Sequence, residues 1–168
     1  MSNSRIRILG IDPGSVITGY GLIESDGVHS VHLAHGHLRV RDDDFPKRLG
    51  TIFSRIRDIV AEWQPAECAV EEVFMSKNPM SALKLGQARG AAICAVVESG
   101  IGVSEYSTRL IKQCVTGTGG ASKQQIQHMV GVLLNVRDNL QADAADGLAV
   151  ALCHAHSRTR KPAGRQVR

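Results

Sequence analysis

Four carboxylates are the residues of this 168-residue chain whose type and spacing could do chemistry: Asp12, Glu71, Asp143 and Asp146. Cutting a phosphodiester at neutral pH requires a nucleophilic water and a stabilised leaving oxygen, and two Mg²⁺ ions about 4 Å apart can supply both. Mg²⁺ takes oxygen ligands and keeps several waters, so a few carboxylates from different elements suffice. We therefore take these four residues as candidate metal ligands.

Two of these carboxylates, Asp12 and Asp143, also have simpler explanations when each is taken alone. Asp12 precedes Pro13-Gly14, which is typical of a turn whose Asp side chain bonds to nearby amides. Asp143 suits the first turn of a helix, where negative charge is favourable. This explains Asp146 less well, since Asp146 is surrounded by alanine and glycine. Such small neighbours let a helix approach a sheet closely and leave room for a metal ion and its waters.

The fourth carboxylate, Glu71, is ambiguous with its neighbour Glu72 in a predicted strand over 68–74. A carboxylate in an apolar strand is costly to bury unless it is paired or bound to metal, although an exposed edge strand would avoid the cost. Successive strand residues point to opposite faces, so only one of the two would face a site. The pattern alone does not decide which.

The rest of the chain predicts the elements that must hold these carboxylates. Apolar alternation predicts strands over 6–12, 18–23, 31–39, 68–74 and 103–106, and apolar spacing of three and four residues predicts helices over 49–63, 81–98, 109–115, 122–134 and 142–156. Three antiparallel strands followed by alternating helices and strands indicate a mixed α/β fold. Ligands of such sheets gather at the carboxyl ends of strands, where Asp12 is expected.

Composition limits the class of protein. The net charge of +4 and the pI of about 9.1 permit nucleic-acid binding without requiring it. None of the four cysteines forms a C-x-x-C pair, and no apolar run reaches about 18 residues. We therefore expect a cytoplasmic protein with reduced thiols. Length favours one domain, over residues 1–156, and a basic, disordered tail over 157–168.

Four segments, in order, resemble the RuvC family of bacterial Holliday-junction resolvases. They are GIDPG and TGYG within 10–21, VEEVF at 70–74, SALKLGQARG at 81–90 and QADAADGLA at 141–149. One Asp-Pro-Gly turn would be weakly specific, but four matching segments are strongly specific. The resemblance covers about residues 5–156, nearly the whole folded chain.

The resemblance implies an RNase H-like fold, with a five-stranded mixed sheet and helices on both faces. It implies a homodimer that binds a four-way DNA junction and nicks two strands of like polarity symmetrically, leaving 5′-phosphate and 3′-hydroxyl ends. The family's metal-binding quartet maps onto Asp12, Glu71, Asp143 and Asp146, which selects Glu71 over Glu72 by analogy. It further implies two Mg²⁺ ions per active site, with Mn²⁺ as a substitute, and a RuvA–RuvB branch-migration partner.

Three further positions match residues with DNA-binding roles in the family: Phe74, Lys112 and Lys123. The aromatic at Phe74 would stack on a base, although it also suits a strand-end core position. Lys123 follows a glycine-rich loop and opens a helix, an arrangement that can bind phosphate. Gly86 and Gly90 lie four residues apart in a helix, which is typical of close packing on the chain's own sheet, whereas the family uses this helix at or near the dimer interface.

Three other functions are compatible with parts of the sequence. An actin- or hexokinase-like phosphotransferase also carries a phosphate loop after its first strand, but it needs two lobes and a second such loop. A catalytically silent module could bind junctions without cutting them, although the intact quartet argues against it, and a nuclease of RNA–DNA hybrids would share the fold. A zinc site at His128, Cys153, His154 and His156 fits no standard finger spacing.

Overall fold

A single mixed β-sheet organises the molecule. The computed structural model describes residues 4–41, 44–72, 78–136 and 140–158. Within them, five strands pair in the order β3-β2-β1-β4-β5. The strands are β1 (Ile6–Asp12), β2 (Ile17–Ser25), β3 (Ser30–Arg39), β4 (Glu67–Glu71) and β5 (Val103–Tyr106).

The sheet has an antiparallel half and a parallel half that meet at β1. β2 pairs antiparallel with both β1 and β3, whereas β4 runs parallel to β1 and β5 runs parallel to β4. The carboxyl ends of β1, β4 and β5 therefore share one edge of the sheet. The tight turn after β1 is closed by Thr18, whose hydroxyl donates to the Gly14 carbonyl at 3.1 Å.

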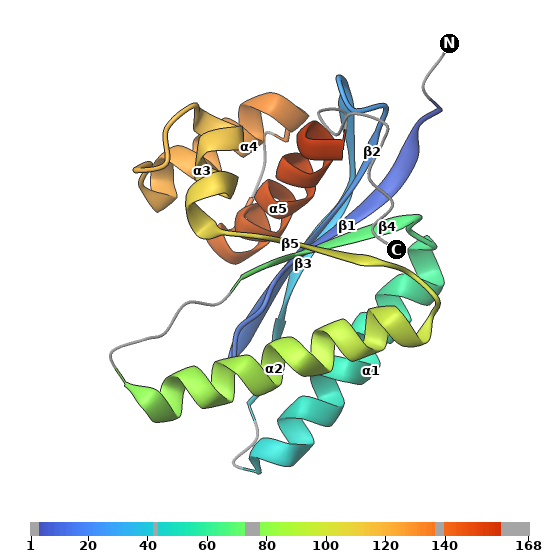
Figure 1. The fold of residues 1–168 in the computed structure, drawn as a ribbon, viewed down its shortest axis with the longest axis vertical. Helices are drawn as coiled ribbons and strands as arrows, with labels where there is room; N and C mark the ends of the chain where they lie inside the picture. Colours follow the sequence, from blue (N-terminus) through green and yellow to red (C-terminus); the bar gives the residue numbers. More distant parts are fainter. Residues whose placement is uncertain (1–3, 42–43, 73–77, 137–139, 159–168) are drawn as a thin grey trace, which may run out of the picture.

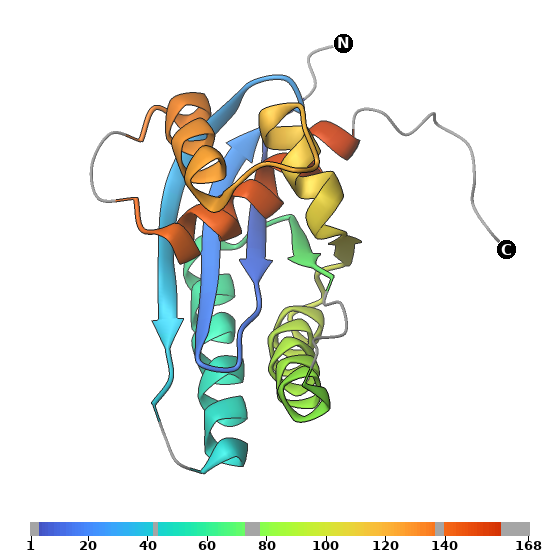
Figure 2. The same ribbon diagram turned by 90° about the vertical axis from the view of Figure 1, so that its left-hand side faces the viewer.

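Helices cover both faces of the sheet, as Figure 1 shows. One face carries α1 (Phe45–Trp63) and α2 (Pro79–Glu98), and the other carries α3 (Thr108–Thr116), α4 (Lys123–Leu134) and α5 (Ala142–Arg158). The second view shows α5 running across β1 and β2 (Figure 2). The predicted five-stranded mixed sheet with helices on both faces is confirmed.

Two apolar cores follow from the strand alternation. Ile8, Ile23 and Ala69 point toward α3, α4 and α5, whereas Leu9 and Val70 point toward α1 and α2. All five are fully buried. Because successive strand residues alternate between the faces, this pattern also fixes the direction of the residues at the strand ends.

Most element boundaries agree with the sequence-based predictions to within a few residues. Helix α5 continues through Arg158, two residues beyond its predicted end. Strand β4 runs from Glu67 to Glu71; Glu72 follows it outside the strand, and the last two residues of the predicted range 68–74 lie outside the described part of the chain. None of the described helices combines the length and apolar character needed to cross a bilayer.

Candidate active site

Two carboxylates meet at the carboxyl edge of the parallel half of the sheet. Ile11 of β1 pairs with Val70 of β4, so Asp12 and Glu71 are the next residues on neighbouring strands. Ile11 and Val70 lie in the core under α1 and α2, and alternation therefore turns Asp12 and Glu71 toward the α5 face. The backbone register alone thus brings these two side chains together.

The third carboxylate is brought in by an unusually close helix–sheet contact. A Cβ on Gly10 would lie 2.2 Å from the Gly147 carbonyl oxygen and 2.4 Å from the Ala151 nitrogen. A Cβ on Gly147 would lie 2.5 Å from the carbonyl carbon of Tyr20. The backbone of α5 therefore rests directly on β1 and β2, and Asp146 reaches the end of β1.

These side chains line one pocket of about 240 Å³. Its acidic wall consists of Asp12, Glu71 and Asp146, and Lys112 and Lys123 line it as well. Lys123 Nζ lies 3.6 Å from Asp146 Oδ2, yet the lysine side chain is 73% exposed. A lysine placed in this way can neutralise a carboxylate and still face an incoming anion.

The pocket lining contains three carboxylates but only two lysines. Burial, together with the neighbouring Glu71 and Asp146, raises the pKa of Asp12 to about 9, although the charge of Lys123 opposes them. Burial also raises the pKa of Asp146; there the charge of Lys123 opposes the effect, while Glu71 and Asp143 add to it. Crowded carboxylates of this kind gain most from a bound cation, because it removes both the repulsion and the cost of burial.

The donor set suits a hard divalent cation. The acidic ligands are carboxylate oxygens from three different elements, the type that Mg²⁺ prefers. In the described residues, no three His, Cys, Asp or Glu side chains are close enough to hold one ion as they stand. Side-chain rotations of Asp12 and Asp146 toward Glu71, whose carboxylate accepts a hydrogen bond from Thr108, would therefore have to accompany binding.

Asp143 is placed next to this pocket but does not line it. It lies in the first turn of α5, one turn before Asp146, and its charge acts on that residue. Its backbone is firmly seated, since a Cβ on Gly19 would lie 1.9 Å from the Asp143 carbonyl oxygen. The structure thus brings together three of the four predicted carboxylates and puts the fourth at their side.

The remaining predicted residues have different outcomes. The pocket lining includes Glu71 and not Glu72, whose backbone N–H donates to the Tyr106 carbonyl at 2.8 Å. Lys112 and Lys123 lie at the pocket, as the resemblance implied. Phe74 lies outside the described residues, and its DNA-stacking role stays a prediction.

Two residues at this site were missed by sequence reasoning. The hydroxyl of Thr108, the first residue of α3, donates to Glu71 Oε1, and Arg89 of α2 donates from Nε to the Glu71 carbonyl oxygen at 3.3 Å. The only sequence signal for Thr108 is its position just after a predicted strand, at the edge where Asp12 and Glu71 were expected. Arg89 lies in the family segment 81–90, but nothing in the sequence indicated its contact with Glu71, which lies 18 positions earlier in a different element.

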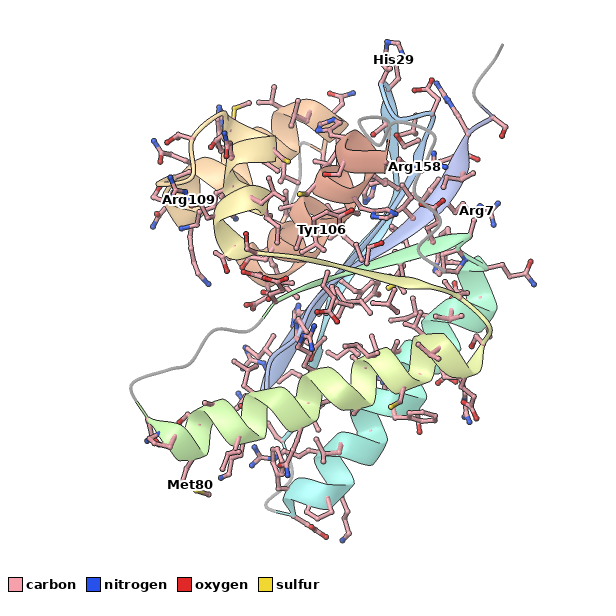
Figure 3. All side chains as sticks on the ribbon, in the orientation of Figure 1. Arg7, His29, Met80, Tyr106, Arg109 and Arg158 are labelled. Carbon is pink, nitrogen blue, oxygen red and sulfur yellow. The ribbon has the colours of Figure 1, made fainter. Side chains whose placement is uncertain are left out.

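The histidine candidate for zinc has another role. His154, which is 5% exposed, contacts Glu67 Oε2 through Nε2 at 2.6 Å and the Tyr106 hydroxyl through Nδ1 at 2.8 Å. Arg158 also pairs with Glu67 at 3.2 Å. This network ties the end of α5 to the first residue of β4, and Tyr106 lies within it between the sheet and the helices (Figure 3).

The fold and the pocket together define the chain as an RNase H-like α/β protein with an acidic pocket at the carboxyl ends of β1 and β4. The sequence profile of one family, described as crossover junction endodeoxyribonuclease RuvC, matches residues 8–154. The chain belongs to that family.

Individual relatives agree with this assignment. A RuvC from Marinobacter nauticus is 57% identical over 149 residues, which cover 89% of this chain and 85% of the relative. A RuvC from Psychromonas ingrahamii is 55% identical over 150 residues, covering 89% and 87%. Among solved structures, Thermus thermophilus RuvC in complex with Holliday junction substrate is 29% identical with a TM-score of 0.84, covering 91% of this chain and 94% of that one.

Proposed function

We propose that this chain is a Holliday-junction resolvase: an endonuclease that nicks two strands of like polarity in four-way DNA junctions during homologous recombination and DNA repair. The products would carry 5′-phosphate and 3′-hydroxyl ends. The observation that carries the proposal is the pocket in which Asp12, Glu71 and Asp146 converge beside Lys112 and Lys123, in a chain of the crossover junction endodeoxyribonuclease family.

The proposed cofactor is Mg²⁺, two ions per active site, with Mn²⁺ able to substitute. Bound there, the ions would activate a water for attack and stabilise the departing 3′ oxygen. We take Asp12 as the central ligand, since the charges of Glu71 and Asp146 both act on it. Glu71, Asp143 and Asp146 complete the ligand set, the last two on one face of α5.

The lysines supply the DNA-binding part of the proposal. Lys123 stands at the start of α4, where the helix dipole favours an anion and its ammonium group is largely exposed. Lys112 lines the same pocket from α3. We expect both to contact phosphates near the scissile bond, and Phe74 to stack on a base. Action in the cytoplasm and cooperation with a RuvA–RuvB branch-migration complex belong to the same proposal.

A homodimer is proposed through the outward face of α2. Met80 and Leu83 are each 61% exposed on this helix, and Cys94 and Val97 are exposed as well. Met80 projects from the first turn of α2 away from the sheet (Figure 3). This apolar stripe has no partner within the described chain that would explain it, and two symmetric nicks need two active sites. A second copy of the chain meets both requirements.

The dimer is tested with a charge placed in the stripe. Leu83→Glu should convert a dimer into a monomer in sedimentation experiments, because it buries a carboxylate in an apolar interface. Val132→Glu is the matched control, since Val132 is 59% exposed but lies on α4. A bismaleimide should also cross-link wild-type dimers through Cys94, and Cys94→Ser should abolish this product. Identical sedimentation of both glutamate variants would rule out α2 as the interface.

The catalytic proposal is tested with a synthetic four-way junction, with both nicks mapped in the presence of Mg²⁺. Asp12→Asn should keep junction binding and lose cleavage, because the amide retains the shape of the side chain but not its charge. Asp58→Asn, an exposed change on α1 behind the sheet, should cleave like wild type. RNA–DNA hybrid and linear duplex are offered in parallel. Preferential cutting of the hybrid, or full activity of Asp12→Asn, would contradict the assignment.

A further inference from the structure

Glu71 is held from outside its strand at two points. Its carbonyl oxygen accepts a hydrogen bond from Arg89 Nε at 3.3 Å, and its carboxylate Oε1 accepts one from the Thr108 hydroxyl. Arg89 is itself fixed by Glu105, whose Oε2 lies 2.8 Å from the guanidinium. The main chain and the side chain of Glu71 therefore have separate anchors, on α2 and α3.

Thr108 reaches Glu71 because of the parallel register of β4 and β5. Tyr106 pairs with Glu71, and the chain then turns into α3 two residues later. Ser107 already caps this helix, since its side chain accepts a hydrogen bond from the Leu110 nitrogen. The Thr108 hydroxyl is therefore not required for capping, and it lines the same pocket as Glu71.

The contact restricts a side chain that would otherwise have freedom. A glutamate has three rotatable bonds. The side chain of Asp12 shares a hydrogen bond with Glu71 only while Asp12 is protonated, and the two carboxylates repel each other once a cation takes the place of that proton. A hydroxyl donor on Oε1 selects one rotamer, and it leaves Oε2 and the second lone pair of Oε1 available to a cation. Partners that orient a ligating carboxylate in this way raise the affinity of the site, because less motion is lost on binding.

We infer that Thr108 is a positioning residue: its hydroxyl fixes the Glu71 carboxylate in the orientation that binds a divalent cation next to Asp12 and Asp146. This rests on the proposed function only in taking Glu71 as a cation ligand. Since Arg89 holds the main chain independently, removing the Thr108 hydroxyl loosens the side chain and not the strand.

The experiment compares Thr108→Val, Thr108→Ala and Thr108→Ser in the full-length protein. Val keeps the shape and β-branching without the donor, Ala removes the donor without adding a methyl group, and Ser restores the hydroxyl. Thr51→Val is the matched control, because the Thr51 hydroxyl bonds only to its own helix, at the Lys47 carbonyl at 3.0 Å. Mn²⁺ affinity is measured without DNA by electron paramagnetic resonance, beside the Mg²⁺ dependence of junction cleavage.

Val and Ala should weaken Mn²⁺ binding about 10- to 100-fold and raise the half-saturating Mg²⁺ concentration similarly, the usual cost of losing such a partner. The rate at saturating Mg²⁺ and the junction Kd should change much less, and Ser should restore the affinity. Wild-type affinity in folded Val and Ala variants, or a Ser variant as weak as Val, overturns the inference. A wild-type protein that binds Mn²⁺ but cuts no junction overturns the proposed function instead, and leaves the Mn²⁺ comparison decisive for Thr108.

Discussion

Helices α5 and α2 are both rich in small residues, yet they use them in opposite ways. A Cβ on Gly147 of α5 would meet backbone atoms of β2 at 2.5 Å, whereas one on Gly86 or Gly90 of α2 would meet no described atom within 4 Å. On α5, small residues permit contact between backbones, and this contact positions the acidic centre. On α2, they leave an open surface. Packing on its own sheet therefore does not explain the Gly86–Gly90 spacing.

The contrast extends to the polar contacts of the two helices. The last turns of α5 are tied to β4 through His154, Arg158 and Glu67. The last residue of α2, Glu98, is exposed, and the outward stripe of this helix remains in solvent. The α5 side thus packs like the inside of a domain and positions the acidic pocket, whereas the α2 side presents the exposed apolar stripe through which we propose the homodimer.

The largest effect should come from filling the α5–sheet contact. Gly10→Ala places a methyl group 2.2 Å from a carbonyl oxygen of α5, so the helix must move away from β1. We expect a loss of about 3 kcal/mol or more in the free energy of unfolding, at or above the upper end of the usual cost of overpacking. Denaturant unfolding of the metal-free protein measures it. A stability equal to that of wild type would mean that α5 is not seated as closely as described.

A smaller loss is expected from releasing the far end of α5. Glu67→Ala removes the 2.6 Å contact to buried His154 and the pairing with Arg158, and it should cost about 1–3 kcal/mol. Glu98→Ala, at the exposed end of α2, should change stability by less than about 0.5 kcal/mol. Thermal unfolding of the two variants compares the helix ends directly. Equal effects would remove the distinction drawn between them.

The parts of the fold and of the site that could be predicted from the sequence are those that local residue patterns determine. Strand alternation and helical spacing predicted the sheet, and the position of Asp12 at a strand end followed from its turn. Glu71 could not be distinguished from Glu72 by pattern alone, because the strand parity relative to each face is set by tertiary packing. The family resemblance made that choice, and the pocket lining includes Glu71.

Contacts between residues far apart in the chain could not be predicted from the sequence, for a physical reason. His154 and Glu67 are 87 positions apart and Thr108 and Glu71 are 37 apart, so no periodicity links them. His154 was weighed as a zinc ligand because histidine and cysteine cluster locally in the sequence. The structure shows that its partners include a carboxylate and a phenol brought together by the sheet.

The close packing of α5 against the sheet also buries the carboxyl group of Asp12, and this lowers the stability of the metal-free protein. On α2, by contrast, the carboxylate of Glu98 is exposed. The pKa of Asp12 is raised to about 9 by burial and by Glu71, so between pH 3.8 and about 9 this carboxyl holds its proton in the folded protein but not in the unfolded chain. The contribution of Asp12 to the stability of the metal-free protein therefore falls as pH rises through this window. Asparagine does not ionise in the unfolded chain, so Asp12→Asn removes this cost and should stabilise the metal-free protein at pH 8 by at least about 1 kcal/mol, the equivalent of one pKa unit.

The gain from Asp12→Asn should shrink at pH 5, because pH 5 lies only about one unit above the unfolded value of 3.8 and keeping the folded carboxyl protonated then costs less. Unfolding in the presence of a chelator at both pH values measures it, with Asp58→Asn as the exposed control. A variant less stable than wild type at pH 8 would show that the Asp12 charge is well compensated without metal. Added Mg²⁺ should reverse the order, because only the wild type gains from the ion.

The smallest effect, and the most specific to α2, concerns Gly86→Ala. Alanine stabilises an exposed helix position by about 0.5–1 kcal/mol relative to glycine, and no described atom obstructs it in the single chain. Gly50→Ala on α1 is the matched control, since its Cβ is equally free. Both variants should stabilise the monomer to a similar extent. Only Gly86→Ala should weaken self-association, by up to about tenfold in Kd for each 1.4 kcal/mol of interface energy lost. Sedimentation over a range of protein concentrations measures self-association separately from the stability of the monomer. If both variants dimerise as well as the wild type, the contact with the second copy lies on α2 away from Gly86.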